Sequence, residues 1–134
     1  YQTSQLEHVL SGAIRLMEEA EPQVEIRMPR QTMRMPHGQI AAIASHGHTL
    51  DVFTVSGALL KSLQTFAELE AMLQGDERFL PCNRGVLVNM DEALKLDGDS
   101  IILMNGMRFP LRHHNRLEIV NRFSEYQIRR MKRG

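Results

Sequence analysis

Arginine, histidine and asparagine side chains gather at three places where the sequence predicts turns. Arg84 follows Asn83 and precedes Gly85, which favours a turn from which the arginine projects outward. The sequence His46-Gly47-His48 is typical of a hairpin tip. A third group lies where a predicted strand ends and a predicted helix begins, and consists of Arg112, His113, His114, Asn115 and Arg116. Such side chains bind phosphates and base edges, so these places are candidates for contact with nucleic acid.

The third group has a further property that favours phosphate. A helix is expected from about residue 115 to residue 131, and the start of a helix offers backbone N–H donors and a favourable dipole. His48 at the hairpin tip could join this group. The alternative, that the three places are unrelated surface loops, stays open from spacing alone.

Metal, thiol and catalytic chemistry have weaker support. His46 and His48 would share one face of a strand, but no third ligand has a recognisable spacing to them, so no metal site is expected. Cys82 is the single cysteine and is expected to be a buried strand residue rather than an activated thiolate. The nucleophile elbow, the Walker A loop, the H-E-x-x-H motif and the dinucleotide-binding G-x-G-x-x-G are all absent from the sequence. We therefore expect a non-enzymatic protein without a cofactor.

Short strands must position these polar groups. Strand patterns with turn signals between them cover residues 24–28, 31–35, 40–44, 48–55, 58–61, 79–89, 92–96, 100–104 and 107–111. Asn105-Gly106 predicts a hairpin with a type I′ turn, in which both residues have positive φ. Between strands, Thr65 and Glu68 form a capping box and Gly75 supplies a stop, which predicts a short helix.

Two further helices are expected at the ends of the sequence. Residues 4–20 carry an apolar stripe, begin with a capping box of Ser4 and Glu7, and are followed by Pro22. The helix at residues 115–131 is expected to bury Leu117, Val120 and Phe123, with Ile119 and Tyr126 nearby. Its basic end, Arg129 to Arg133, complements the helix dipole and needs no partner.

The net charge of zero conceals a strong asymmetry. The chain has 134 residues, with 16 Lys and Arg against 16 Asp and Glu. Residues 1–26 have a net charge of −4, whereas residues 110–134 carry seven basic and two acidic residues. Residues 27–134 alone have a net charge of +4, which suits a basic face on one domain. The single cysteine and the absence of a secretion signal or a long apolar run favour a cytoplasmic protein.

Residues 79–89, FLPCNRGVLVN, resemble the signature of LytTR-type DNA-binding domains, commonly F-x-R-x-H-R-S-x-L-V-N. The resemblance extends forward to ILMNG at residues 102–106 and FPLR at residues 109–112, and back to IASHGHTL at residues 43–50. In total it covers about residues 24–123. The sequence departs from the family pattern at Pro81, Asn83 and Gly85 and at Arg112-His113, and these departures concern base preference rather than fold.

The resemblance implies a mainly β fold, an elongated sandwich of about ten short strands with a short internal helix and a C-terminal helix. It implies that His48, Asn83, Arg84, Arg112 and His113 contact double-stranded DNA, and we add Arg116 from its position and charge. Such domains follow a receiver domain in bacterial response regulators and bind paired repeats in promoters as homodimers. We accordingly expect residues 23–134 to form the DNA-binding domain, and residues 1–22 to be a helix and linker outside it, the end of a truncated receiver domain.

Two other classes of function stay open on the sequence. A ligand- or nucleotide-sensing β module is one, since Arg30 and Arg34 have the spacing of the R-x-x-x-R arm of PilZ-like domains. The D/N-x-S-x-x-G motif that accompanies this arm is missing. The other is a protein-interaction domain that dimerises through the N-terminal stripe. This last class predicts a stable dimer without salt-dependent affinity for DNA.

Overall fold

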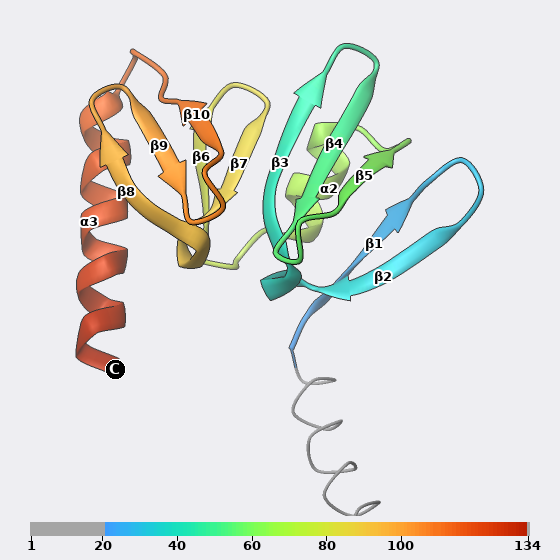
Figure 1. Ribbon diagram of the computed structural model, residues 1–134, viewed down its shortest axis with the longest axis horizontal. Helices are drawn as coiled ribbons and strands as arrows, with labels where there is room; N and C mark the ends of the chain where they lie inside the picture. Colours follow the sequence, from blue (N-terminus) through green and yellow to red (C-terminus); the bar gives the residue numbers. More distant parts are fainter. Residues whose placement is uncertain (1–20, 134) are drawn as a thin grey trace, which may run out of the picture.

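The computed structural model describes residues 21–133 and shows a mainly β protein with ten short strands in three antiparallel sheets (Figure 1). Strands β1 (Gln23–Arg27) and β2 (Thr32–Pro36) form a two-stranded sheet. The five-stranded sheet has the order β5-β4-β3-β7-β6. Its strands are β3 (Ile40–His46), β4 (Thr49–Thr54), β5 (Leu59–Ser62), β6 (Phe79–Asn83) and β7 (Val86–Asn89).

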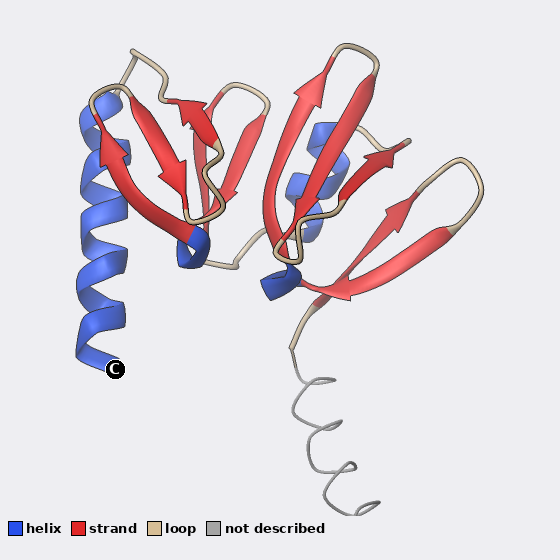
Figure 2. Ribbon diagram, viewed as in Figure 1, coloured by secondary structure: helices blue, strands red, loops and turns tan. Residues whose placement is uncertain are grey.

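A three-stranded sheet and a long helix complete the described part of the chain. Strands β8 (Ala93–Asp97), β9 (Ser100–Leu103) and β10 (Arg108–Pro110) form the sheet in the order β10-β9-β8. Helix α2 (Phe66–Met72) lies between β5 and β6, and α3 (Arg116–Arg133) follows β10 (Figure 2). Single 3₁₀ turns, η1 (His37–Gln39) and η2 (Met90–Glu92), precede β3 and β8. Neither α2 nor α3 is long and apolar enough to cross a membrane.

The five-stranded sheet is buried on both faces. Neighbouring residues of one strand therefore enter different cores: Ala42 and Val88 face one core, and Ile43 and Leu87 face the other. This explains why residues 40–44 and 86–88 are nearly continuous apolar runs. The five-stranded sheet is consequently the wall between two hydrophobic cores.

Each core is closed by different elements. The first core lies between this sheet, the three-stranded sheet and α3, and includes Leu80, Ile101, Phe109, Ile119 and Phe123. The second core lies under α2 and the β1–β2 hairpin, and includes Val24, Ile26, Val52, Leu69 and Phe79. The two outer sheets are thus held on opposite faces of the central one.

A buried asparagine connects the central strands to the start of the three-stranded sheet. Asn89, at the end of β7, is fully buried and donates from Nδ2 to the carbonyl oxygen of Ile40 at 2.9 Å. Its Oδ1 accepts from the backbone N–H of Asp91 at 2.9 Å and so caps η2. Both halves of the amide are satisfied, as a buried polar group requires.

Gln64 fastens the β1–β2 hairpin to the central sheet. Its buried side chain donates from Nε2 to the carbonyl oxygen of Glu25 at 2.8 Å and accepts from the backbone N–H of Arg27 at 2.9 Å. The backbone N–H of Leu63 donates to the carbonyl oxygen of Arg27 at 2.8 Å. The guanidinium of Arg27 adds an ion pair with Glu68 at 3.0 Å. These bonds therefore anchor β1 as far as Arg27, its last residue before the β1–β2 loop.

The predicted mainly β fold, with a short internal helix and a C-terminal helix, is confirmed, while several local expectations are corrected. The stretch at residues 79–89 is two strands rather than one, and the turn predicted at Arg84, which joins them, is confirmed. Of the capping box, only one half forms, because Thr65 accepts from Glu68 N while the Glu68 carboxylate pairs with Arg27. The predicted helix at residues 4–20 lies outside the described residues.

Two other predictions were wrong in detail. Gly106 has a φ of 92° but Asn105 does not have a positive φ, so the loop is not a type I′ turn. Leu103 N donates instead to Met107 O at 2.8 Å, which closes a three-residue loop. Leu117 is 70% exposed, because α3 turns the face formed by Ile119, Phe123 and Tyr126 toward the core.

Replacing Asn89 by leucine, N89L, is expected to lower the free energy of unfolding by about 1–3 kcal/mol, since the buried carbonyl of Ile40 loses its donor and η2 loses its cap. Urea unfolding followed by circular dichroism measures this change. The matched control is N121A at an exposed position of α3, where a change within about 0.5 kcal/mol is expected. Equal stability of N89L and wild type would contradict the linking role of Asn89.

Candidate nucleic-acid interface

Three loops that carry the predicted contact residues lie at one edge of the molecule, the upper edge in Figure 1. They are the β3–β4 turn with His48, the β6–β7 turn with Arg84, and the segment between β10 and α3, residues 111–115. Positions more than 60 residues apart in the sequence therefore lie along one edge, with the β6–β7 turn between them. We call these three loops the upper loops.

Backbone hydrogen bonds fix the upper loops relative to one another. Ser45 N, near the end of β3, donates to the carbonyl oxygen of Gly85 at 2.8 Å. Arg112 N donates to the carbonyl oxygen of Cys82 on β6 at 2.9 Å. The side chain of Asn83 donates from Nδ2 to the carbonyl oxygen of Pro110 at 3.1 Å. The β6–β7 turn is thus bonded to both of its neighbours.

Arg84 is the most available cation of this group. It is exposed, and its guanidinium has no hydrogen-bond or ion-pair partner among residues 21–133. The turn is held from within, since Asn83 Oδ1 accepts from Arg84 N at 2.8 Å. Gly85 has a φ of 71°, and a Cβ at this position would lie 3.1 Å from the Cβ of Ser45. Glycine therefore suits both the conformation and the close approach of β3.

The guanidinium of Arg116 binds backbone carbonyls of the segment before α3. Its Nε donates to the carbonyl oxygen of Arg112 at 3.2 Å, and its Nη2 donates to the carbonyl oxygen of Leu111 at 3.3 Å. Nη2 also lies 3.2 Å from Nδ1 of His113. Asn115 precedes the helix with a φ of 54° and is the one non-glycine residue with positive φ in the described chain. Asparagine tolerates this left-handed conformation better than most residues.

The side chain of Arg112 makes one hydrogen bond and one ion pair in the structure. Its Nε donates to the carbonyl oxygen of His114 at 2.9 Å, and its Nη2 lies 3.6 Å from Oε2 of Glu118. The side chain keeps 34% of its surface exposed. His48, His113 and His114 are exposed. Nη2 of Arg112 can therefore exchange the long, exposed ion pair with Glu118 for a phosphate, while Nε keeps its hydrogen bond to His114.

Acidic residues border the upper loops on the side of the three-stranded sheet. Asp97 ends β8 and Asp99 lies in the β8–β9 turn, where its carbonyl oxygen accepts from Leu111 N at 2.7 Å. Arg108 pairs with Asp97 at 3.3 Å. A polyanion at this edge would therefore contact positive charge at the upper loops. It would contact negative charge next to the segment between β10 and α3, at the β8–β9 turn.

The structure thus places all six predicted contact residues in or beside the upper loops, with different roles. Arg84, His48 and His113 present exposed side chains, whereas Asn83 and Arg116 make bonds that shape the loops. The positive φ of Asn115 was not predicted, because this residue was expected to be the first residue of the helix. An asparagine at the predicted start of a helix is the signal that could have indicated it, because asparagine tolerates a positive φ.

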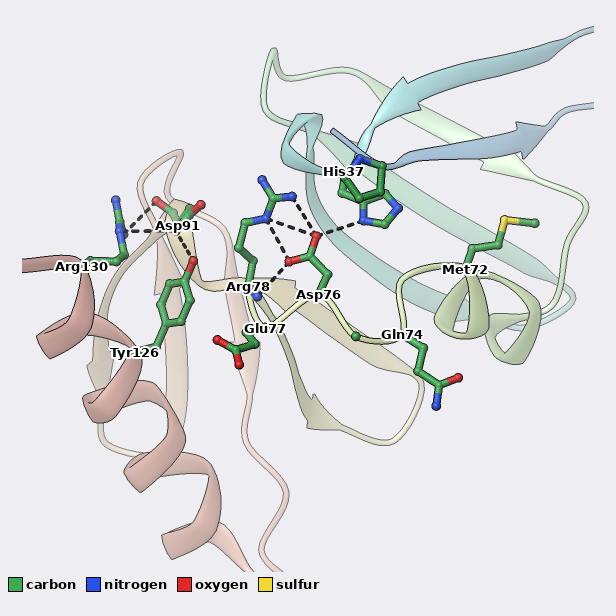
Figure 3. A pocket seen from close by; sticks show the side chains of 11 residues that line it. His37, Met72, Gln74, Asp76, Glu77, Arg78, Asp91, Tyr126 and Arg130 are labelled. Atoms are coloured by element: carbon green, nitrogen blue, oxygen red, sulfur yellow. Dashed lines mark hydrogen bonds and ion pairs between the residues drawn. The ribbon is translucent and has the colours of Figure 1, made fainter. Parts of the chain in front are cut away.

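A cavity of about 890 Å³ lies away from the upper loops, between η1 and α3 (Figure 3). Its ionised groups are paired with each other. Asp76 accepts from Arg78 at 2.8 Å and contacts Nδ1 of His37 at 2.9 Å. On the α3 side, Asp91 accepts from the hydroxyl of Tyr126 at 2.6 Å and pairs with Arg130 at 3.3 Å.

This pairing makes the cavity a structural junction. Arg78 also pairs with Glu21 at 3.1 Å, so the carboxylates of Glu21 and Asp76 hold one guanidinium between them. Burial alone would raise the pKa of Asp76, but the hydrogen bonds from Arg78 and His37 outweigh it and lower the pKa. The cavity does not supply unpaired charge to a ligand. No group of three or more His, Cys, Asp or Glu residues within residues 21–133 could hold a metal ion.

Cys82 lies inside the first core and carries no reactive chemistry. Its side chain is fully buried on β6. Burial raises the pKa of the thiol to about 12, outweighing the lowering effects of a backbone hydrogen bond and of the charge of Arg112. The expectation of a buried strand cysteine is confirmed.

The three antiparallel sheets with their internal and C-terminal helices define the fold of LytTR-type DNA-binding domains. The particular structure that shows this is a LytTr DNA-binding domain from Bacillus cereus, described as part of a methyl-accepting/DNA response regulator. The superposition has a TM-score of 0.59 and covers 78% of this chain and 95% of that domain, at 14% sequence identity. No protein-family model matches the sequence, and no curated protein matches it.

Replacing Asp76 by asparagine, D76N, is expected to destabilise the protein near pH 7, because the ion pair with Arg78 is lost. The pKa of Asp76 is lowered in the folded state, so its carboxylate stabilises the protein above pH 3.8, the ordinary value, and this contribution disappears as the pH falls through the folded pKa. Urea unfolding between pH 7 and pH 3 should show the gap between wild type and D76N closing at acid pH. The control D99N, at an exposed aspartate, should show no such gap.

The Cys82 thiol is expected to resist thiol reagents in the folded protein. A pKa of about 12 instead of 9.0 reduces the thiolate fraction about a thousandfold near pH 8, and burial excludes the reagent as well. Stopped-flow labelling with a disulfide reagent, with and without 8 M urea (about the usual unfolding concentration), measures the difference. Equal labelling rates in the two conditions would show that the first core does not enclose Cys82.

Proposed function

We propose that this protein binds duplex DNA sequence-specifically and controls transcription as the output domain of a two-component response regulator. The observation that carries the proposal is the gathering of His48, Arg84, Arg112 and His113 at one edge, on loops that backbone hydrogen bonds fix in place. The shared fold with a LytTr DNA-binding domain supports it independently. The proposed activity requires no catalytic step.

Some residues of the upper loops are proposed to contact DNA, and others to position the loops. Arg84 is proposed to contact a base edge or a phosphate, since guanidinium pairs with guanine in the major groove and with phosphate oxygens. His48 and His113 contact the duplex on either side of it. Asn83 and Arg116 position these contacts through their bonds to the carbonyls of Pro110 and Arg112. Arg112 exchanges Glu118 for a phosphate.

The proposal includes the arrangement of the full-length protein. Two copies bind paired repeats in a promoter as a homodimer, and a receiver domain precedes the DNA-binding domain, with residues 1–22 as its end and the linker. The distribution of charge agrees with this division, since residues 1–22 have a net charge of −3 and residues 23–134 have a net charge of +3. A cytoplasmic location follows from the proposed role.

The two other classes of function have less support. The carboxylates and guanidiniums around the cavity of about 890 Å³ are paired with each other, which disfavours an anionic nucleotide as its ligand. Arg34 lies opposite Glu25 in the β1–β2 ladder, while Arg30 lies in the loop, so the two arginines do not form a joint clamp.

Replacing Arg84 by alanine, R84A, is expected to weaken binding to duplexes selected from a randomised pool by about 10- to 100-fold, because one base or phosphate contact is lost. Fluorescence anisotropy measures the affinity. The matched control is K95A, which removes one exposed positive charge from β8 and should change affinity less than about twofold. Circular dichroism should show R84A to be folded, since its side chain has no partner in the described chain.

The salt dependence of the same titrations tests the electrostatic part. About six phosphate contacts predict a slope of log K against log salt near −5. A slope near zero, or no selection of any duplex from the pool, would refute DNA binding. An unchanged affinity of R84A with a steep slope would instead remove Arg84 from the interface.

A further inference from the structure

We infer that the β1–β2 loop, residues 28–31, is a fourth contact with DNA, in which Arg30 binds a backbone phosphate beside the duplex segment at the β3–β4 turn. The inference rests on the proposed DNA binding and extends it to a part of the chain that the upper loops do not include. Its first support is position: in Figure 1 the β1–β2 loop projects from the same side of the molecule as the β3–β4 turn.

The second support is the charge of the loop. Its residues are Met28, Pro29, Arg30 and Gln31, without an acidic residue. Arg30 is exposed and has no hydrogen bond or ion pair within residues 21–133. The other two arginines of the hairpin differ, because Arg27 is paired with Glu68, and Arg34 lies on β2 opposite Glu25 rather than in the loop. The hairpin thus presents an unpaired cation at its tip.

The third support is that the loop is held rigidly. Met28 N donates to the carbonyl oxygen of Gln31 at 2.8 Å, which closes the loop, and Pro29 fixes one of its φ angles. Immediately before the loop, the buried Gln64 holds the backbone of Arg27. A phosphate contact on a preorganised loop loses little conformational entropy on binding. An arginine on such a loop therefore adds affinity at low cost.

The geometry also indicates how the duplex must run. The β1–β2 loop is set back from the β3–β4 turn in Figure 1, so a duplex that touches both must curve toward the protein. A phosphate contact on the flank of the site would stabilise this curvature without reading a base. Arg30 is therefore expected to affect salt dependence and bending more than sequence preference.

The test compares R30A, R30K and R34A in the full chain, with duplexes selected by the wild type. R30A is expected to weaken binding about 3- to 10-fold for every duplex sequence and to reduce the salt slope by about one. R30K keeps the charge and should retain the wild-type slope. R34A removes the same charge from the middle of β2 and should leave the slope unchanged. Hydroxyl-radical footprinting should show that R30A loses protection only at the flank beyond the β3–β4 turn.

The outcomes separate this inference from the proposed function. If R30A binds with wild-type affinity, slope and footprint while R84A is impaired, the fourth contact is overturned and DNA binding stands. If R30A and R34A reduce the slope equally, the hairpin acts through its general charge and the specific contact of Arg30 is overturned. If the wild type binds no duplex, the proposed function itself fails. Energy transfer between dyes at the two duplex ends should report a smaller bend with R30A.

Discussion

The burial of one sheet on both of its faces is the constraint on which the structure depends. Strands β3 and β7 lie between two hydrophobic cores, so their side chains are apolar in both directions and their backbone groups must bond within the sheet. In β3 and β7, polar side chains can therefore lie only near the ends of the strands. The wall between the cores consequently forces the chemistry of the protein to its loops, and it fixes the places from which those loops project.

The mainly β fold was predictable because its signals are local. Gly47, Gly75, Gly98 and Gly106 have positive φ angles and lie at turns or at a helix stop that the sequence indicates. The capping threonine of α2 was also predictable from its spacing to Glu68. The pairing of β3 with β7 carries no local signal, because two apolar runs in the sequence do not state which strands they adjoin. Leu117 was misplaced for a related reason: α3 has two possible apolar stripes, and packing against β6 decides between them.

The candidate interface was predictable in its residue types but not in its division of roles. Arg84 and Arg116 look alike in the sequence, as arginines next to turns. Only the structure shows that Arg116 is occupied by the carbonyls of Leu111 and Arg112, whereas Arg84 has none of these bonds. The same holds for Asn83, whose amide joins β6 to β10. Whether a polar group contacts a ligand or supports a loop depends on neighbours that lie far away in the sequence.

The shared wall also has a consequence for the order in which the chain folds. The hairpins β3–β4 and β6–β7 join segments close in sequence and can form early, but the contact between β3 and β7 joins Ala44 to Val86 across the whole of β4, β5, α2 and β6. Closing so long a loop has a large entropic cost before any apolar surface is buried in return. Neither core has its complete wall until that contact exists. Folding of the domain is therefore expected to be limited by one long-range strand pairing, after which both cores can close.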